Sequence, residues 1–235
     1  MRCADDRELA TLWSAAFVLT LGIFVLWPQL DIMVSRVFWT PRAGFWLGRV
    51  TELQALRTVV WNASIAMFLA SIGFFLAALV RKPVFGIGAR VWGYIALLYL
   101  LGPILLVNGL LKSFWGRARP ADVVEFGGSQ QFTPPYMPSD QCAANCSFVS
   151  GEGSAATALA VALLVLAPHV RRALPSWAFR VYVALSVAVP AIGLGMRLAT
   201  GRHFLSDTLF AVLFVLGIAI ALRRILRPEA SPHGA

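Results

Sequence analysis

Charged residues are scarce in this sequence, and so are residues that bind transition metals. Only 13% of the 235 residues are charged, about half of the ~25% that is usual in soluble domains. Histidine and cysteine each occur three times. Cys142 and Cys146 have no second pair or histidine beside them, which is poor spacing for zinc. The shortage of charge excludes an ordinary soluble domain, and the cysteine spacing argues against a structural metal.

The sequence contains long runs of apolar residues. Hydrophobic residues make up 59% of the chain, and the mean hydropathy is +0.75. A helix needs ~20 residues to cross the ~30 Å hydrocarbon core of a bilayer. Six windows approach this length: 9–27, 59–80, 91–111, 148–167, 178–196 and 204–222. We therefore expect an all-α integral membrane bundle of six transmembrane helices, built as one domain over residues 1–235.

Basic residues lie between the apolar runs rather than along one stripe. The net charge is +9 and the pI is about 10.5, but this distribution is typical of membrane topology and argues against nucleic-acid binding. Six spans place both termini on one side, with eleven of the twenty Lys and Arg residues there and nine opposite. Lys112, Arg119 and Arg197 are among these nine and are candidate active-site residues, so without them the comparison is eleven against six. The bias predicts cytoplasmic termini.

Two segments on the side opposite the termini are long. Residues 28–58 interleave aromatic residues and arginines with apolar residues, which suits a segment lying in the membrane interface. Residues 113–147 are rich in Gly, Pro, Ser and Gln, which predicts extended and turn structure. They include Cys142 and Cys146, whereas Cys3 is isolated. A local disulfide is favoured if this segment faces an oxidising compartment, and two free thiols are the alternative.

Polar residues at the ends of the last four spans need an explanation, because polar groups in a membrane are costly. Alternation of the spans brings the end of the third, the start of the fourth, the end of the fifth and the start of the sixth to one membrane face. The groups can therefore converge on one pocket. They are Lys112, Arg117, Arg119, Ser150, Gly151, Glu152, Arg197, His203 and Asp207.

Three long cationic side chains in such a pocket call for an anion. The guanidinium groups of Arg119 and Arg197 match phosphate oxygens in pairs, and Lys112 adds a third positive charge. Ser150 and Gly151 stand at the start of a predicted helix, where free N–H groups and the helix dipole favour an anion. The glycine also allows the anion to approach closely.

His203 and Asp207 are spaced i, i+4, so we expect them on one helical face. An aspartate that accepts the proton of one imidazole nitrogen leaves the other nitrogen free to attack. Together with the anion pocket, this pair favours phosphoryl transfer through a histidine, which mostly needs positioning and charge neutralisation. The neighbouring Arg117 and Arg202 are expected in the membrane interface, and contact of either with the lipid headgroup is the alternative.

Three stretches of the sequence resemble the signature motifs of a known family. They read KSFWGRARP at 112–120, VSGE at 149–152 and RLATGRHFLSD at 197–207. These stretches resemble the motifs of the type 2 phosphatidic acid phosphatase (PAP2) superfamily, which includes bacterial phosphatidylglycerophosphate, undecaprenyl pyrophosphate and lipid A phosphatases. Six spans are typical of its membrane members, so the resemblance implies a PAP2-like fold.

The resemblance implies a role for each matching residue, and it implies neither a metal nor a cofactor. His203 would be the nucleophile that forms a phosphohistidine, oriented by Asp207. The phosphate would be bound by Lys112, Arg119, Ser150, Gly151 and Arg197. Two positions depart from the family pattern. Met196 stands where the family usually has serine, with little expected effect, and Glu152 stands where it usually has the histidine acid that protonates the leaving group.

Glu152 therefore has three alternative roles. It is a general acid that keeps its proton at neutral pH, a group that activates the water that hydrolyses the phosphohistidine, or a structural residue. Glutamate titrates near ~4.3 and histidine near ~6.5, so at neutral pH glutamate is largely ionised and is the poorer proton donor unless burial or the charge of the phosphate raises its pKa. We therefore expect leaving groups that hardly need an acid, such as diphosphates or sugar 1-phosphates, to be tolerated better than simple alkoxides.

The expected activity is hydrolysis of the terminal phosphate of a lipid at the periplasmic face of a bacterial inner membrane. The candidate substrates are phosphatidylglycerophosphate, phosphatidic acid, undecaprenyl pyrophosphate and lipid A. The expected partners are this lipid and the bilayer, with residues 28–58 and 113–147 shaping access to the headgroup. Two alternatives are a lipid phosphotransferase and a non-catalytic lipid-phosphate transporter or binding protein.

Overall fold

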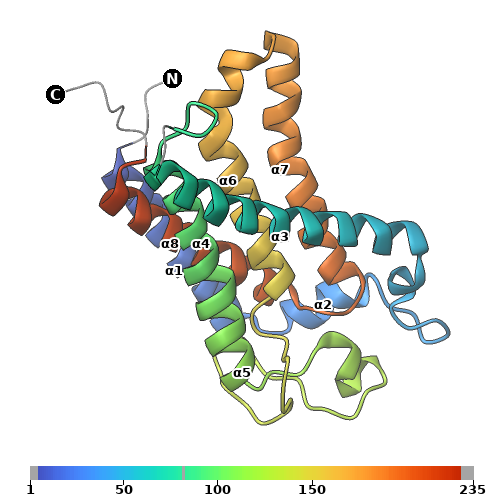
Figure 1. The fold of residues 1–235 in the computed structure, drawn as a ribbon. Coiled ribbons are helices and arrows are strands. Elements are labelled where there is room, and N and C mark those ends of the chain that lie inside the picture. The colour runs from blue at the N-terminus through green and yellow to red at the C-terminus, as the bar shows by residue number, and fades with distance from the viewer. Residues whose placement is uncertain (1–4, 81–82, 229–235) are drawn as a thin grey trace.

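Six long helices form most of the protein (Figure 1). The computed structural model describes residues 5–80 and 83–228. Within these residues, six helices are long and apolar enough to cross a membrane, so the predicted all-α bundle of six spans is confirmed. They are α1 (Asp6–Leu26), α3 (Thr51–Val80), the continuous helix Ala89–Phe114, α6 (Gly151–Ala173), α7 (Ser176–Ala199) and α8 (Leu205–Leu226).

The first and the last of these helices meet at one end of the bundle. Nε of Arg223, near the end of α8, lies 3.2 Å from Oδ1 of Asp6 at the start of α1. Arg224 donates to the main-chain carbonyl of Asp6 over 2.7 Å. α1 therefore begins and α8 ends on the same face. Four positions used in the predictions lie outside the described residues: Arg2, Cys3, Arg81 and Lys82.

The third span changes its helical pitch as it approaches the site. α4 (Ala89–Tyr99) continues into η2 (Leu100–Leu111), a π-helix that contains Pro103, and ends in α5 (Lys112–Phe114). Proline has no N–H to donate to the helix, and π-helical turns are frequent at functional sites. The side chain of Asn108 donates to the carbonyl of Pro103 over 2.6 Å. Beyond this wider section, α5 begins with the first predicted phosphate ligand.

α6 is the central helix of the bundle, and it packs against α3, α7, α8 and η2. Small side chains let neighbouring helices approach closely, which is how membrane helices gain packing energy where lipid is as apolar as the protein. The first half of α6 buries small residues of this kind: Gly153, Ser154, Ala155, Ala156 and Ala158. The N-terminus of α6 consequently lies among the ends of the surrounding helices.

Residues 28–58 fold against the end of the bundle that carries the predicted site residues. They form α2 (Leu30–Arg36), η1 (Trp46–Arg49) and the first turns of α3. The second long helix therefore begins eight residues earlier than the apolar window at 59–80, because the mixed polar sequence of 51–58 continues the helix beyond the apolar run.

Residues 113–147 cover the same end of the bundle. After α5 they contain two short helical turns, η3 (Pro120–Asp122) and η4 (Val124–Phe126), within turns and irregular chain. The two long segments share a small apolar core with the start of α8. Its buried members are Ile32, Ala118, Val123, Phe126 and Phe204.

Candidate active site

The predicted site residues meet at the end of the bundle where α5 ends and where α6 and α8 begin. Nη1 of Arg197 in α7 lies 3.2 Å from Oε2 of Glu152 in α6. The main-chain N–H of Ser150 donates to the carbonyl of Asp207 in α8 over 3.2 Å. These contacts join helices α6, α7 and α8 at one point, so the convergence expected from the alternation of spans is present in the fold.

The N-terminus of α6 has the features of an anion site. Ser150 caps the helix, with its Oγ accepting from the N–H of Gly153 over 3.1 Å, and an accepting hydroxyl keeps its own proton to donate. A Cβ on Gly151 would lie 2.8 Å from Oδ1 of Asn108 and 3.5 Å from Cδ of Lys112. Lys112 therefore lies beside a helical turn whose N–H groups and dipole favour an anion.

His203 is a buried imidazole whose proton position is defined by its neighbour. The residue is 1% exposed, and Nδ1 lies 2.8 Å from the carbonyl of Ser147. A carbonyl only accepts, so Nδ1 carries the proton and Nε2 carries the lone pair. Burial, together with the charges of Arg197 and Lys112, holds the pKa of His203 well below its ordinary value. The ring is therefore neutral at neutral pH, and the lone pair of Nε2 is available.

Asp207 orients His203 indirectly, which corrects the predicted direct contact. Its Oδ2 accepts from Oγ of Ser147 over 2.5 Å and from the N–H of Phe204 over 2.8 Å. α8 begins only at Leu205, so His203 lies in the preceding loop and the i, i+4 geometry of a helix does not apply. Asp207 instead holds Ser147, whose carbonyl in turn holds the imidazole.

Arg117 lies buried beneath the site, where the sequence predicted an interface residue. Its side chain is 0% exposed, with Nη1 2.5 Å from Oδ1 of Asp207 and Nη2 2.8 Å from Oδ2 of Asp31. Burial lowers the pKa of Arg117, but the carboxylates of Asp207 and Asp31 raise it more, and the net shift is upward. The guanidinium group also lies 4.4 Å from the ring centre of Phe204. A charged Arg117 thus joins residues 113–147 to α8.

Asp31 supports the site from α2, and the sequence predictions missed it. It is fully buried. In addition to Arg117, it accepts from the main-chain N–H of Ser206 over 2.9 Å and from the Ser206 hydroxyl over 2.5 Å. A lone carboxylate in the apolar stretch LDIMV at 30–34 needs a partner, because an unpaired buried charge is costly. A single carboxylate within an apolar stretch is therefore the sequence signal that points to Asp31.

Glu152 forms a two-armed ion pair with Arg57 of α3, a residue that the predictions left outside the site. Nε and Nη2 of Arg57 donate to Oε2 and Oε1 of Glu152 over 2.7 and 2.6 Å. Arg197 also lies against Oε2. Two guanidinium groups stabilise the ionised carboxylate and occupy both of its oxygens. This geometry suits a residue that positions arginines, and it does not suit a proton donor.

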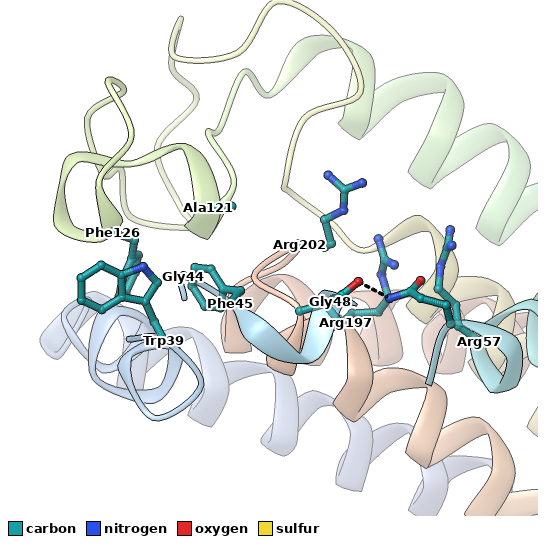
Figure 2. Close-up of a pocket in the computed structure, with 11 residues that line it drawn as sticks. Trp39, Gly44, Phe45, Gly48, Arg57, Ala121, Phe126, Arg197 and Arg202 are labelled. Atoms are coloured by element: carbon teal, nitrogen blue, oxygen red, sulfur yellow. Dashed lines mark hydrogen bonds between the residues drawn. The ribbon is translucent and has the colours of Figure 1, made fainter. Parts of the chain in front are cut away.

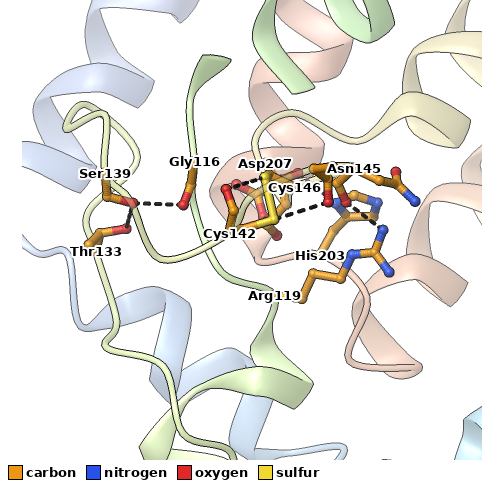
Figure 3. Close-up of a disulfide and its surroundings, with 11 residues drawn as sticks. Gly116, Arg119, Thr133, Ser139, Cys142, Asn145, Cys146, His203 and Asp207 are labelled. Carbon is orange, nitrogen blue, oxygen red and sulfur yellow. Dashed lines mark hydrogen bonds between the residues drawn. A yellow bond between two sulfur atoms is a disulfide. The ribbon is translucent and has the colours of Figure 1, made fainter. Parts of the chain in front are cut away.

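A disulfide joins Cys142 and Cys146 and closes a short loop beside the site (Figure 3). Within that loop, the carbonyl of Asn145 accepts from Nη2 of Arg119 over 2.6 Å. The residue after the disulfide is Ser147, whose carbonyl bonds to the imidazole. The cross-linked segment therefore contacts both a predicted phosphate ligand and the predicted nucleophile.

Metal-binding side chains do not gather anywhere in residues 5–80 and 83–228. No group of three or more His, Cys, Asp or Glu residues there is arranged to hold a metal ion. Positive charge at the site comes instead from Lys112, Arg119 and Arg197, next to the N-terminus of α6. Such an arrangement can bind a phosphate group and present its phosphorus to Nε2 of His203.

Comparison with known proteins agrees with this geometry. The model of the PAP2 superfamily matches residues 90–230. A lipid A 4'-phosphatase of Francisella tularensis subsp. novicida is 32% identical over 202 residues, covering 82% of this chain and 84% of that protein. A lipid A 4'-phosphatase of Rhizobium etli is 34% identical over 226 residues, covering 86% of this chain and 81% of that protein.

The fold is also similar to a solved structure. The crystal structure of a transmembrane PAP2-type phosphatidylglycerolphosphate phosphatase from Bacillus subtilis superimposes with a TM-score of 0.57. The two sequences are 16% identical, and the match covers 94% of this chain and 98% of that chain. The family match, the curated relatives and the shared fold confirm what the three motifs predicted: the chain belongs to the PAP2 superfamily.

Proposed function

We propose that the protein removes the 4'-phosphate of lipid A at the periplasmic face of a bacterial inner membrane. The chain is a membrane lipid phosphatase, in keeping with its superfamily, its relatives and its six apolar helices. Lipid A is the proposed lipid because two lipid A 4'-phosphatases match over more than four fifths of their length. The observation that carries the mechanism is the buried, neutral imidazole of His203, held by Ser147 beside three cations.

The proposed reaction has two steps, both centred on His203. In the first, Nε2 attacks phosphorus, a P–N bond forms, the P–O bond to the sugar breaks, and the leaving oxygen takes a proton from water. In the second, water attacks the phosphohistidine and releases inorganic phosphate, the P–N electron pair returns to Nε2, and the proton lost by the attacking water neutralises the hydroxide left from the first step. A buried neutral imidazole suits this cycle because its lone pair is available without a preceding loss of a proton.

The phosphate oxygens are proposed to bind Lys112, Arg119 and Arg197, together with Ser150 and the N–H groups at Gly151. Charge spreads over these oxygens in the transition state of phosphoryl transfer, so fixed positive groups lower the barrier. The proposal assigns this task to protein groups and includes no metal. Residues 1–235 are proposed to act as a single phosphatase domain.

Glu152 is proposed to position Arg197 and Arg57 rather than to move a proton. Of the three roles considered from the sequence, the structural one is best supported by the two-armed contact with Arg57. The proposed substrate also departs from the expected leaving groups. A 4'-phosphate is an ester of a sugar hydroxyl, so its leaving group is an alkoxide rather than a diphosphate or a sugar 1-phosphate.

Phosphate release from lipid A is the direct test of this function. The purified protein in detergent is expected to release phosphate in the presence of a chelator, and mass spectrometry of the product should show that the 4'-position was cleaved. Phosphatidic acid and phosphatidylglycerophosphate serve as comparison substrates. Release from these lipids without release from lipid A would overturn the proposed substrate and leave the enzyme class intact.

Replacing Glu152 by glutamine is expected to lower kcat/KM about tenfold for every leaving group, because Arg197 loses its partner. Arg57→Gln should reproduce most of that loss. The measurement is kcat/KM for phosphatidic acid and for undecaprenyl pyrophosphate across the pH range. Arg49→Gln, which changes an exposed arginine of η1, is the control. If Glu152 were a general acid, the loss would be confined to phosphatidic acid, whose leaving group is an alkoxide. The pH profile of the variant would then also lack its basic limb.

Opening the Cys142–Cys146 disulfide is expected to slow phosphate release about tenfold, because the carbonyl of Asn145 would no longer hold Arg119 in place. Rates are compared before and after treatment with dithiothreitol. The double variant Cys142→Ser/Cys146→Ser should start at the lower rate and show no further response to the reductant. Identical rates for oxidised and reduced wild type would show that the loop does not position the site.

The termini are proposed to be cytoplasmic, which places the site in the periplasm. Basic residues of the face opposite the site support this orientation: Arg171 and Arg172 end α6, and Arg223 and Arg224 end α8. A C-terminal fusion to green fluorescent protein is expected to fluoresce, and a C-terminal fusion to alkaline phosphatase should be inactive. An alkaline phosphatase fusion truncated within residues 113–147 should be active. The reverse pattern would invert the proposed topology.

A further inference from the structure

A cavity of about 340 Å³ opens beside Arg197 (Figure 2). Its size falls within the ~300–1,000 Å³ that is usual for small-molecule sites. Residues 28–58, residues 113–147 and the loop after α7 all contribute to its walls. Because Arg197 belongs to both the cavity and the proposed phosphate site, the cavity adjoins that proposed site.

The cavity is built onto the loop that carries His203. Gly201 has φ +66°, and a Cβ there would collide with the ring of Phe45. Glycine meets both requirements, since it adopts positive φ readily and has no side chain to clash. The N–H of Ala121 donates to the carbonyl of Gly201 over 3.1 Å. Both long segments therefore touch a residue two positions before the proposed nucleophile.

Aromatic rings form one end of the cavity. The ring centres of Trp39 and Phe126 are 5.7 Å apart, and those of Phe45 and Phe126 are 5.2 Å apart. Figure 2 shows these three rings grouped away from Arg197 and Arg57. The rings are inclined to one another by 59° and 66°, so they form an apolar corner, and the π-electron face of each ring attracts the positive edge of a partner.

Polar groups line the remainder of the cavity. Nε2 of Gln54 donates to the carbonyl of Gly48 over 3.1 Å, which fixes the amide and leaves its oxygen to accept from a ligand. Arg202 is exposed, and in Figure 2 it stands between the aromatic end and Arg197. An amide and a guanidinium group suit a ligand with several hydroxyl or acidic substituents.

We propose that this cavity binds the sugar ring that carries the scissile phosphate. A pyranose ring has an apolar C–H face, which would stack on Trp39, and a rim of polar substituents, which would bond to Gln54 and Arg202. A ring joined directly to a phosphate held by Arg197 would extend into this space. The inference rests on the proposed phosphatase activity, and it adds that the enzyme selects phosphorylated sugar lipids over glycerol lipids, which have no ring to stack.

Trp39→Ala tests the aromatic wall by comparing two lipid substrates. The KM for lipid A is expected to rise about tenfold through loss of the stacked ring, while the KM for phosphatidic acid should stay unchanged. Retained turnover of phosphatidic acid also shows that the variant is folded. Arg202→Gln should raise the KM for lipid A in the same selective way. Trp46→Ala, a matched change at an exposed tryptophan of η1, should leave both substrates unaffected.

A soluble probe separates this inference from the proposed substrate. The deacylated, unphosphorylated glucosamine disaccharide should inhibit phosphatidic acid hydrolysis by the wild type, and Trp39→Ala should weaken that inhibition about tenfold. If lipid A is not cleaved but this inhibition and its loss are seen, the sugar site stands and the proposed substrate fails. If lipid A is cleaved but Trp39→Ala shifts both lipids equally, or the inhibition is absent, the sugar site is overturned.

Discussion

Replacing His203 by alanine is expected to abolish phosphate release, with kcat/KM falling by a factor on the order of 10⁴ or more. The expected loss is this large because, in the proposed reaction, Nε2 of His203 forms the bond to phosphorus and its removal abolishes the covalent step. The structure supplies the neutral imidazole that this step needs, with Nδ1 occupied by the carbonyl of Ser147. The measurement is phosphate release from lipid A by purified wild type and variant.

Two further experiments secure the interpretation of that loss. His169→Ala changes a histidine of α6 on the far side of the bundle from the site and should retain full activity. Rapid quenching with labelled substrate should trap a phosphoenzyme that is labile in acid and stable in base, and His203→Ala should lack it. A variant at position 203 that still turned over substrate, or a phosphoenzyme that persisted in it, would assign the nucleophile elsewhere.

Replacing Arg117 by methionine is expected to lower the free energy of unfolding by about 3–5 kcal/mol, because it leaves buried carboxylates without their counter-ion. Arg117 is 0% exposed and bridges Asp31 and Asp207, so the change would also release Ser147 and lower activity. Unfolding by sodium dodecyl sulfate, followed by tryptophan fluorescence, measures the effect.

The matched control for this change is Arg42→Met, at an exposed arginine of residues 28–58, which cover the same end of the bundle. The stability of this variant should be close to that of the wild type. The double variant Asp31→Asn/Arg117→Met should lose less than the sum of the two single changes, since each removes a charge that the other leaves unpaired. Additive losses, or a wild-type transition for Arg117→Met, would mean that the buried ion pairs do not support the fold.

Glu152 departs from the usual PAP2 motif, and its ion-pair partner lies on another helix. The resemblance to the PAP2 motifs predicts a histidine acid at this position, and the chain has a glutamate paired with Arg57 of α3. The carboxylate lies between the guanidinium groups of Arg57 and Arg197, which supports the proposed role of Glu152 in positioning them. The pairing also ties α3, which begins next to the proposed sugar cavity, to the first turn of α6.

Local sequence patterns were sufficient to predict which residues meet at the candidate site. The apolar windows located the six spans, and the three motifs located Lys112, Arg197 and His203 at span ends that meet in the fold. Alternation across a bilayer is a strong constraint, because each span must enter one face and leave the other. The helix boundaries were less accurate, since residues 51–58 extend α3 beyond its apolar run.

The contacts of Asp207, Arg117 and Asp31 were not predictable from spacing. Asp207 stands four residues after His203, but the helix begins between them, so its carboxylate meets Ser147 instead of the imidazole. Arg117 resembled an interface residue because arginines next to spans usually lie at the surface. Its burial depends on ion pairs with Asp207 and with Asp31, which is far away in the chain, in α2.

The sequence by itself determined the membrane class, the six spans, the family and the end of the bundle where chemistry is expected. Length and apolarity of a segment are local properties, and the bilayer converts them into topology. The tertiary structure alone decided which polar groups are in contact: Arg57 with Glu152, Arg117 with Asp31 and Asp207, and His203 with a main-chain carbonyl. A buried charge must find a partner wherever the fold places one, and sequence spacing does not encode contacts between residues that are distant in the chain.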